Sequence, residues 1–311
     1  MGKYYVESGM FVGAVPPWAK MGTSVADAQS SAEALKLAGM DWKVTSEPIQ
    51  VVDGNPIKGF RANVRDIDKK VLGVVTDRYK IVQNEDAFAF TDMLLGEGVK
   101  YETAGVSADG KRVWMLAKME TAKVLGEDVE PYLVFTNSFD GKGAVKVAMT
   151  PIRVVCANAI AMALSKAKRV WSTRHSGDIE SKIQDARKTL LLADSYMEEL
   201  KETADLATQI VIPHPMLVEY LNAMFPVNEN MSDRQKANTE YQKNALLSIY
   251  NNKDDIQRFK GTGYGLMLAA TDFATHFEPL RKTSTFDENR FFGIVDGNKL
   301  IDNTTKFVFA A

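Results

Sequence analysis

The most strand-rich part of the chain is residues 100–150, which read KYETAGVSADGKRVWMLAKMETAKVLGEDVEPYLVFTNSFDGKGAVKVAMT. Four runs of β-branched, aromatic and other apolar residues stand out in it, separated by turn residues. Asp109-Gly110 and Asp140-Gly141 are typical of tight turns, and the acidic residues around Glu127-Asp128 indicate a longer loop. This spacing predicts four successive antiparallel strands, over Lys100–Val106, Arg112–Met119, Pro131–Asn137 and Ala144–Met149.

The segment before these strands combines helix and hairpin patterns. Ser24 is a suitable N-cap for a run of apolar residues at three- and four-residue steps, and Gly39 stands just past the end of that run. Farther along, two β-rich runs flank the turn-rich residues 66–70. The predicted elements are a helix over 25–38, a hairpin with strands at 60–65 and 71–75, and a helix that Asn84 caps and that extends to about Leu95.

Helical patterns dominate the chain after residue 150. Pro151 suits the first turn of a helix that extends to about Lys168, because that turn needs no N–H donor from it. Apolar residues then recur at three- and four-residue steps from Asp178 to about Ile212, which predicts a long amphipathic helix. The remaining predicted elements are helices over 216–225, 233–251 and 262–276, and a final hairpin around Asp296-Gly297 within 290–311.

These patterns predict an α+β fold, in which an antiparallel sheet packed by helices is followed by a mainly helical C-terminal region with a long amphipathic helix. We expect an extended N-terminal arm over residues 1–24, an α+β core domain over 25–177 and the helical region over 178–311. Pro16-Pro17 excludes a regular helix or a central strand from the arm. Such an arm either lies over the core or packs on a neighbouring subunit.

The composition is that of an ordinary globular protein, with 45% hydrophobic and 25% charged residues. No apolar run approaches the roughly 18 residues that a membrane span needs, and residues 1–7 lack the features of a secretory signal. We therefore expect a cytoplasmic protein with no membrane partner. A single cysteine and three histidines make no disulfide or zinc pattern, so neither a metal nor a cofactor is expected.

The sequence contains no familiar catalytic motif, and we expect no catalytic residue. Gly261–Gly265 is rich in glycine, but no Gly-Lys-Ser/Thr of a phosphate-binding loop follows it and no strong strand precedes it. Cys156 and His175 suggest a thiolate nucleophile, yet the cysteine stands in an apolar run where a buried, inert thiol is more common. Thr136–Gly141 and Asp77–Lys80 are polar enough for a site, but we interpret the first as a turn and the second as a structural bend.

A series of motifs extends from about residue 15 to residue 195. They are Pro17-Trp18 with Gly22-Thr23, Ala38–Val44, Val75–Asn84, Arg112–Trp114, Thr136–Ser138 with Asp140-Gly141, Thr150–Asn158 and Arg174–Gly177. In their order and spacing the chain resembles the phage/plasmid-like protein family, a domain family of unknown function found in phages, prophages and plasmids. The resemblance implies a mobile-element setting and no known reaction. Members typically read Trp-His-Gly-Leu-Gly near the start, whereas this chain reads Trp18-Ala19-Lys20-Met21-Gly22, so we interpret the family's histidine as structural.

One stretch has a marked charge asymmetry. Between Gly141 and Gly177 there are seven lysines or arginines and no aspartate or glutamate. Local positive fields of this kind bind phosphate backbones, and the aromatic rings among these cations could stack on exposed bases. The alternative is a strand–helix unit whose lysines only face water. The predicted nucleic-acid-binding residues are Lys142, Lys146, Arg153, Lys166, Lys168, Arg169, Trp171, Arg174 and His175.

The function expected from these residues is non-catalytic binding of single-stranded DNA by a homo-oligomer, with strand annealing in phage or plasmid recombination as its role. Annealing proteins resemble the predicted layout of an antiparallel sheet backed by helices, but this is an analogy of fold alone. One alternative is a protein-interaction module of a mobile element, such as an inhibitor or decoy of a host defence factor, that uses helix 178–212 as its contact face. An unrecognised enzyme acting on nucleic acid is a third reading.

Overall fold

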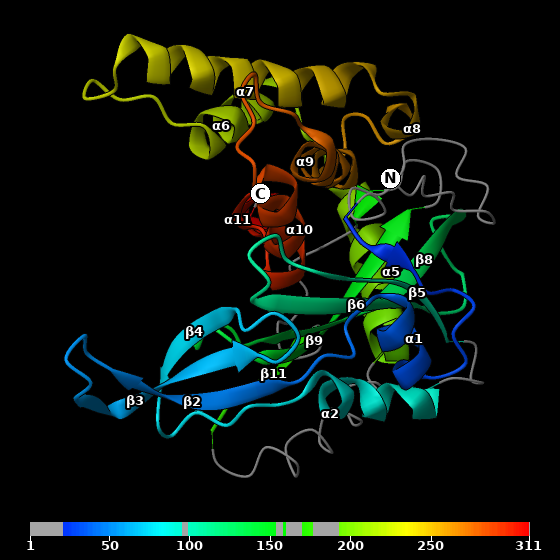
Figure 1. The fold of residues 1–311 in the computed structure, drawn as a ribbon. Coiled ribbons are helices and arrows are strands. Elements are labelled where there is room, and N and C mark those ends of the chain that lie inside the picture. The colour runs from blue at the N-terminus through cyan, green and yellow to red at the C-terminus, as the bar shows by residue number, and fades with distance from the viewer. Residues whose placement is uncertain (1–20, 95–98, 154–157, 160–169, 177–192, 311) are drawn as a thin grey trace.

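The four predicted strands of residues 100–150 are confirmed and form the centre of an antiparallel sheet. The computed structural model describes the chain except residues 1–20, 95–98, 154–157, 160–169, 177–192 and 311. Within these bounds the larger sheet has the order β1-β5-β6-β8-β9-β10, with β7 also paired to β8 and β11 to β9 (Figure 1). Its strands are β1 (Thr23–Ser24), β5 (Lys100–Val106), β6 (Arg112–Lys118), β7 (Ala122–Val124), β8 (Glu127–Ser138), β9 (Val145–Arg153), β10 (Asn158–Ala159) and β11 (Val170–Thr173).

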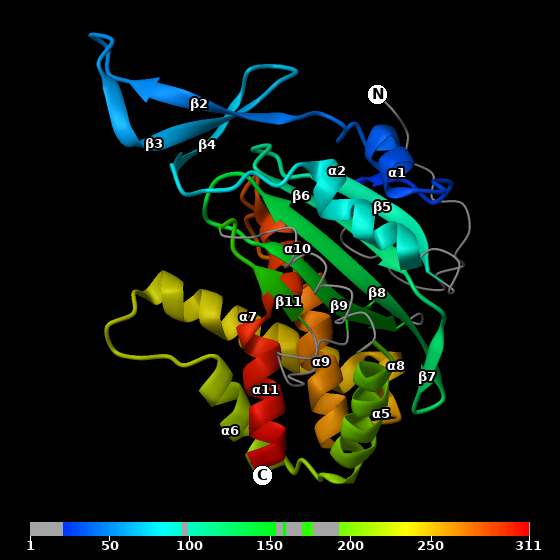
Figure 2. The ribbon, with the colours of Figure 1, turned by 90° about the horizontal axis from the view of Figure 1, so that it is seen from below.

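A smaller antiparallel sheet contains the predicted hairpin, which is also confirmed. Its strands are β2 (Val44–Gln50), β3 (Pro56–Arg65) and β4 (Val71–Thr76). Figure 2 shows this sheet projecting from the side of the larger one. The Asn63 side chain of β3 donates a hydrogen bond of 2.7 Å to the carbonyl of Phe139, in the turn between β8 and β9. The smaller sheet is thereby attached to that turn.

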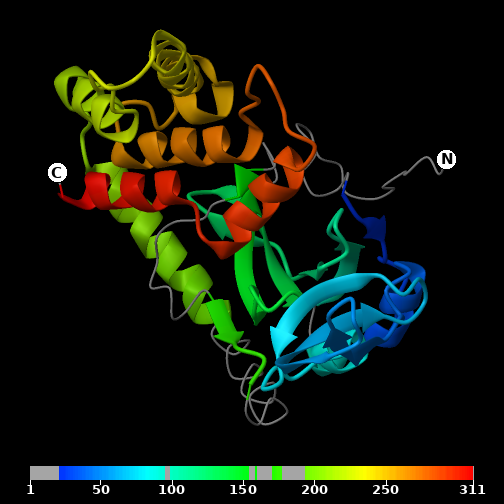
Figure 3. The same ribbon diagram turned by 60° about the vertical axis from the view of Figure 1, so that its left-hand side comes forward.

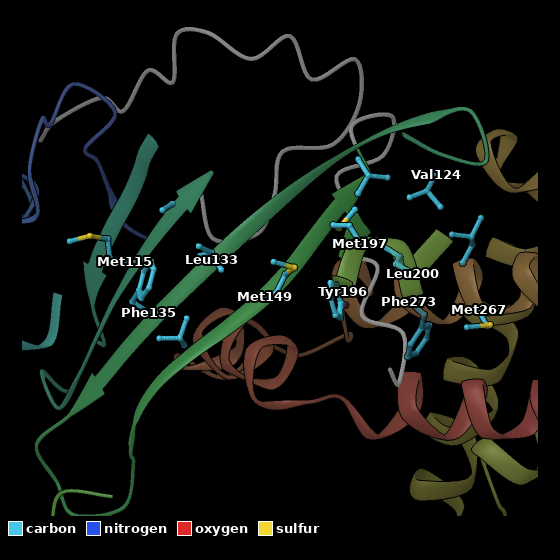
Figure 4. Packing of buried hydrophobic residues seen from close by; sticks show 14 of the residues in the cluster. Met115, Val124, Leu133, Phe135, Met149, Tyr196, Met197, Leu200, Met267 and Phe273 are labelled. Carbon is cyan, nitrogen blue, oxygen red and sulfur yellow. The ribbon is translucent and has the colours of Figure 1, made fainter. Parts of the chain in front are cut away.

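The main core lies on one face of the larger sheet. Because side chains alternate along a strand, Val113 and Met115 of β6 point to the same face, where they join Phe135 of β8. The helix α1 (Ser31–Leu37) contacts α2 (Asn84–Phe88) and β5 at this core. The same core continues to Tyr196 of helix α5 (Ala193–Gln209), which lies beside Met149 in Figure 4.

The opposite face of the sheet carries a second, smaller core. Trp114, Val134 and Ala148 point to this face and pack against helix α10 (Phe286–Asp296). The ring of Phe291 lies 4.9 Å from that of Trp114, centroid to centroid. Helix α10 is therefore fixed against the sheet, with its last residue, Asp296, paired with Lys146 near the start of β9.

The C-terminal helices gather around the almost entirely buried helix α9. Figure 3 shows them on one side of the larger sheet, with the smaller sheet on the other. They are α5 (Ala193–Gln209), α6 (His214–Met224), α7 (Asp233–Asn252), α8 (Asp254–Gln257), α9 (Gly263–His276) and α11 (Lys299–Ala310). The α+β fold with a helical C-terminal region is thus confirmed, as are the predicted helices over 216–225, 233–251 and 262–276, to within two residues at each end.

The two N-terminal helices begin at other residues than predicted. Ser24 lies in β1, paired with Thr103, and the first helix starts later, at the N-cap Ser30. Gly39 does follow the end of α1, with the positive φ of +64° that glycine tolerates. Asn84 is not a cap, because its buried side chain donates instead to the carbonyl of Met40. The α-helix after it ends at Phe88 and continues as the 3₁₀ helix η2 (Ala89–Leu94).

The prediction of a helix that begins at Pro151 is wrong. Strand β9 extends to Arg153, and Pro151 faces Pro131 of β8. Facing residues in an antiparallel pair alternate between hydrogen-bonded and non-hydrogen-bonded positions, so two prolines that share a non-bonded position remove no bond between their strands. Of the long helix predicted over 178–212, the structure describes α5, and the remainder before residue 193 lies outside the described residues.

The predicted hairpin at residues 290–311 is also wrong, because two helices, α10 and α11, meet there. Asp296 ends α10, and Gly297 turns the chain with a φ of +110°. The Asn298 side chain then accepts hydrogen bonds from the backbone N–H groups of Leu300 and Ile301. Asp-Gly followed by an N-capping asparagine is thus a helix–helix junction here and not a hairpin turn.

The predicted N-terminal arm lies outside the described residues up to residue 20, and the division of the chain at residues 24 and 177 stays a prediction. Among the helices that the structure describes, none is both long enough and apolar enough to span a membrane.

Candidate nucleic-acid interface

A cleft of about 590 Å³ lies at the end of the larger sheet where β6, the β8–β9 turn and β11 meet the smaller sheet and α10. Its charged lining residues come from five separate segments of the chain. They are Arg78, Arg112, Lys142, Lys146, Arg174, Asp140 and Asp296. Five cations and two carboxylates give this basic cleft an excess of three positive charges.

Strand register places two of the cations side by side. Arg112 of β6 faces Ser138 of β8, and Lys146 of β9 faces Thr136 of the same strand. Facing residues of an antiparallel pair point to the same side, so Arg112 and Lys146 both point to the face that α10 covers. Arg112 lies over the ring of Phe292 of that helix, 3.6 Å from the ring centroid.

Asp296, at the end of α10, neutralises part of this charge. Its carboxylate pairs with the Arg112 guanidinium at 3.2 Å and also with the Lys146 ammonium. Because Lys146 belongs to the predicted acid-free strip and Asp296 comes from a distant segment, this pair offsets the positive field that the strip predicts. The cations that can still receive a phosphate are therefore elsewhere in the cleft.

Lys142, Arg174 and Arg78 provide the exposed cations. Lys142 lies in the β8–β9 turn, where Gly141 has a φ of +77° and the Asp140 carboxylate accepts a hydrogen bond from the Lys142 N–H. Arg174 directly follows β11, and Arg78 is the second residue after β4. Within the part of the chain that the structure describes, none of these three side chains makes an ion pair.

One wall of the basic cleft is a stacked pair of rings, Tyr79 and His175. Their centroids lie 4.6 Å apart and their planes differ by 14°. The Tyr79 hydroxyl donates to the carbonyl of Ser138 at 2.7 Å, and the His175 Nδ1 atom lies 3.1 Å from the carbonyl of Lys80. Both rings are thereby tied to the backbone around the β8–β9 turn and the hairpin.

The chemistry of His175 follows from its burial. Because a carbonyl oxygen only accepts, the His175 Nδ1 atom must carry the hydrogen. Burial lowers the pKa of this imidazole below its ordinary value of 6.5, against the opposing effects of the Lys80 carbonyl and the Asp140 charge. The ring is therefore neutral near pH 7, and its buried Nε2 atom is an acceptor with no hydrogen-bond partner among the described atoms.

Four of the predicted site residues are brought together in the basic cleft, namely Lys142, Lys146, Arg174 and His175. Arg153 lies seven residues beyond Lys146, toward the other end of β9. Trp171 faces Val147 and packs, partly buried, against the main core on the other face of the sheet. The predicted residues Lys166, Lys168 and Arg169 lie outside the described residues.

Two cleft residues, Arg78 and Arg112, are absent from the set predicted by sequence. Both stand in motifs that carry the family resemblance, Val75–Asn84 and Arg112–Trp114. Their place in these motifs is the sequence feature that could have identified them as site residues. Tyr79 has the structural role that the interpretation of Asp77–Lys80 as a bend predicts, because its hydroxyl is bonded to the Ser138 carbonyl next to the β8–β9 turn. Arg78 beside it is exposed in the cleft.

The cleft holds cations and neutral rings, which suits binding of an anion. Across the described ranges, no group of three or more His, Cys, Asp or Glu side chains is placed to hold a metal ion. Arginine and lysine together recognise phosphate well, since arginine offers a planar fork of N–H donors and lysine a compact charge. The arrangement can therefore bind phosphate groups along one side of a ligand.

Comparison with known protein families matches residues 71–291, more than two thirds of the chain, to a family described as Domain of unknown function (DUF932). The matched residues include every charged side chain of the basic cleft except Asp296. Comparisons with curated proteins and with solved structures give no match. The chain belongs to the DUF932 family.

Proposed function

We propose that the protein binds single-stranded DNA without catalysis, and that the basic cleft receives the phosphates. The observation that supports this most strongly is the convergence of Arg78, Lys142 and Arg174, three exposed cations from separate segments, on one cleft. Each lacks a carboxylate partner among the described residues. Cations placed in this way displace the counterions that surround the phosphates of a nucleic acid, and this release is the main source of sequence-independent affinity.

The size of the cleft favours a single strand. Pockets that enclose small organic ligands have volumes of roughly 300–1000 Å³, and this cleft, at about 590 Å³, lies within that range. A few nucleotides of one strand fit such a space, because their backbone can bend into it. A duplex is stiff and wide, so it would rest across the rim and reach fewer of the cations.

The rings of Trp171 and His175 are not placed for the stacking on nucleobases that the sequence predicts. His175 is only 4% exposed and already stacks on Tyr79, while Trp171 packs toward the core. His175 therefore presents no open face to a nucleobase, and Trp171 does not line the cleft. Phosphate contacts therefore supply most of the proposed affinity, and we expect little preference among base sequences.

The biological setting is the remaining part of the proposal. The family resemblance points to phages and plasmids, where a non-catalytic single-strand binder acts in recombination inside the bacterial cytoplasm. Annealing would follow when two coated strands meet, and a homo-oligomer would extend the groove along each strand. Support for a docking role of helix 178–212 is weaker, because its described part buries Tyr196, Leu200 and Ala204 within the protein's own core.

Fluorescence anisotropy with labelled single- and double-stranded oligonucleotides tests the proposal. We expect the single strand to bind more tightly, and its affinity to fall steeply between about 50 and 200 mM salt. The variant Lys142→Glu/Arg174→Glu should weaken binding at least tenfold. The control variant Lys201→Glu/Lys306→Glu makes the same change of charge on exposed positions of α5 and α11, and it should bind as the native protein does. Equal binding by all three proteins, or binding insensitive to salt, would contradict the proposal.

A further inference from the structure

A second hollow, also of about 590 Å³, lies among the C-terminal helices. It is formed by the first turns of α7 and the segment that follows α9, which rises toward α7 in Figure 1. Two arginines, one tyrosine and one leucine give it its character, and we call it the α7 hollow. The side chains that matter to its chemistry are Arg234, Asn238, Tyr241, Leu280 and Arg281.

Both arginines of the α7 hollow are exposed, and neither makes an ion pair within the described ranges. Two nearby glutamates are held by lysines instead. Glu240 pairs with Lys243 at 3.4 Å, and Glu278 pairs with Lys282 at 2.5 Å. Arg234 and Arg281 thus leave the hollow with two positive charges that Glu240 and Glu278 do not neutralise.

The apolar part of the hollow is exposed but firmly backed. Leu280 is 79% exposed and Tyr241 is 39% exposed. The Tyr241 ring lies 5.7 Å from that of Phe277, which in turn stacks on the buried Phe273 at 4.3 Å. A large apolar side chain and a braced aromatic ring, next to free arginines, have the composition that marks the centre of a protein interface.

We propose that the α7 hollow binds an acidic peptide segment of a partner protein. The carboxylates of that segment would pair with Arg234 and Arg281, since a guanidinium matches a carboxylate with two parallel hydrogen bonds. An apolar side chain of the segment would pack on Leu280 and Tyr241. Asn238 adds an amide that can both donate to and accept from an extended peptide backbone.

A peptide accounts for this combination better than a nucleic acid does. A nucleic acid would use the charges and a ring face, but it would leave Leu280, the exposed leucine of the hollow, without a partner. An acidic peptide that carries an apolar residue uses both parts of the hollow. This proposal is independent of DNA binding at the basic cleft, which lies against the sheets and not against α7.

The test uses the full-length protein and a fluorescein-labelled peptide of six aspartates followed by leucine and phenylalanine. Anisotropy should show saturable binding, with at least tenfold weaker binding for Arg234→Glu/Arg281→Glu and for a peptide with serines in place of the aspartates. Leu280→Ser should weaken binding severalfold. Lys142→Glu/Arg174→Glu, which alters the basic cleft, should leave peptide binding unchanged.

Circular dichroism and thermal unfolding check that the variants fold. If Arg234→Glu/Arg281→Glu does not fold, Arg234→Ala/Arg281→Ala replaces it in the test. Three results would overturn the proposal. One is that the serine peptide binds as tightly as the aspartate peptide. Another is that peptide binding is lost only in Lys142→Glu/Arg174→Glu. The third is a labelled oligonucleotide whose affinity depends on Arg234 and Arg281 more than that of the peptide does.

Discussion

Asp296 and Lys146 stand 150 positions apart in the chain, yet their side chains form an ion pair inside the basic cleft. The same carboxylate also pairs with Arg112 at 3.2 Å. Asp296 is the last residue of α10, where the negative end of the helix dipole disfavours a carboxylate, so the two cations stabilise it there. Asp296 therefore occupies the position that a phosphate would take between Arg112 and Lys146.

Removing this charge should strengthen DNA binding. Asp296→Asn keeps the size of the side chain and frees two cations, so we expect the affinity for a single-stranded oligonucleotide to rise about three- to fivefold at low salt, given that exposed pairs contribute up to ~1 kcal/mol. Anisotropy titrations measure the change. Asp287→Asn, on the same helix but paired with Arg290, serves as the control. An unchanged or lower affinity of Asp296→Asn would show that this carboxylate does not compete with DNA.

Arg78 should make a phosphate contact that the sequence interpretation did not predict. Arg78→Ala is expected to weaken single-strand binding severalfold and to reduce the slope of log affinity against log salt by about 0.7, the value for one contact with a single strand. Arg61→Ala is the matched control, because Arg61 is held by Ser46 on the smaller sheet, with its Nε atom 2.6 Å from the Ser46 hydroxyl. Identical slopes for Arg78→Ala and the native protein would place Arg78 outside the binding surface.

The burial of His175 should make stability depend on pH. Its pKa is lowered in the folded state, so the unfolded chain takes up this proton more readily. The contribution of neutral His175 to the free energy of unfolding is complete above pH 6.5 and is lost as the pH falls below that value toward the folded-state pKa. The free energy of unfolding changes there by at most about 1.4 kcal/mol per pH unit.

Urea unfolding of the native protein and His175→Gln between pH 5 and 8 measures this dependence. Below pH 6.5 the free energy of unfolding should depend less on pH in His175→Gln than in the native protein, because glutamine does not titrate. Parallel curves for the native protein and His175→Gln would mean that this histidine does not contribute.

Close packing of β4 on the β8–β9 turn should make Gly73 difficult to replace. A Cβ atom on Gly73 would lie 2.5 Å from the Asp140 Cα and 2.9 Å from the Phe139 carbonyl oxygen, and backbone atoms cannot move aside cheaply. We expect Gly73→Ala to lower the free energy of unfolding by about 1–3 kcal/mol. Gly293→Ala, in α10 with no atom within 4 Å of the new methyl group, should raise it by roughly 0.5–1 kcal/mol. Equal effects in denaturant titrations would contradict this packing.

The central strands could be predicted because local patterns determine them. Asp109-Gly110 and Asp140-Gly141 both form turns between adjacent strands, with positive φ at each glycine. The same dipeptide at Asp296-Gly297 joins two helices instead. There the preceding apolar residues Phe291, Ile294 and Val295 bury one helical face against the sheet, so tertiary packing decides between the two structures.

The candidate site could be predicted only where its residues are close in sequence. Lys142 and Arg174 belong to one acid-free strip, and strand pairing of β9 with β11 brings their segments together in the cleft. Arg112 and Asp296 join them through sheet register and the docking of α10, which no local pattern reveals. Composition likewise places Trp171 among cations, whereas the alternation of β11 turns its side chain to the core.

Photo-crosslinking of the native protein to a single-stranded oligonucleotide that contains 4-thiothymidine, followed by mass spectrometry, tests the proposed DNA binding at the basic cleft most directly. We expect crosslinks in the peptides that contain Arg78, Lys142 and Arg174, and their loss in Lys142→Glu/Arg174→Glu. Bound oligonucleotide that crosslinks instead to peptides of α6 or α7, and equally so in both proteins, would contradict it.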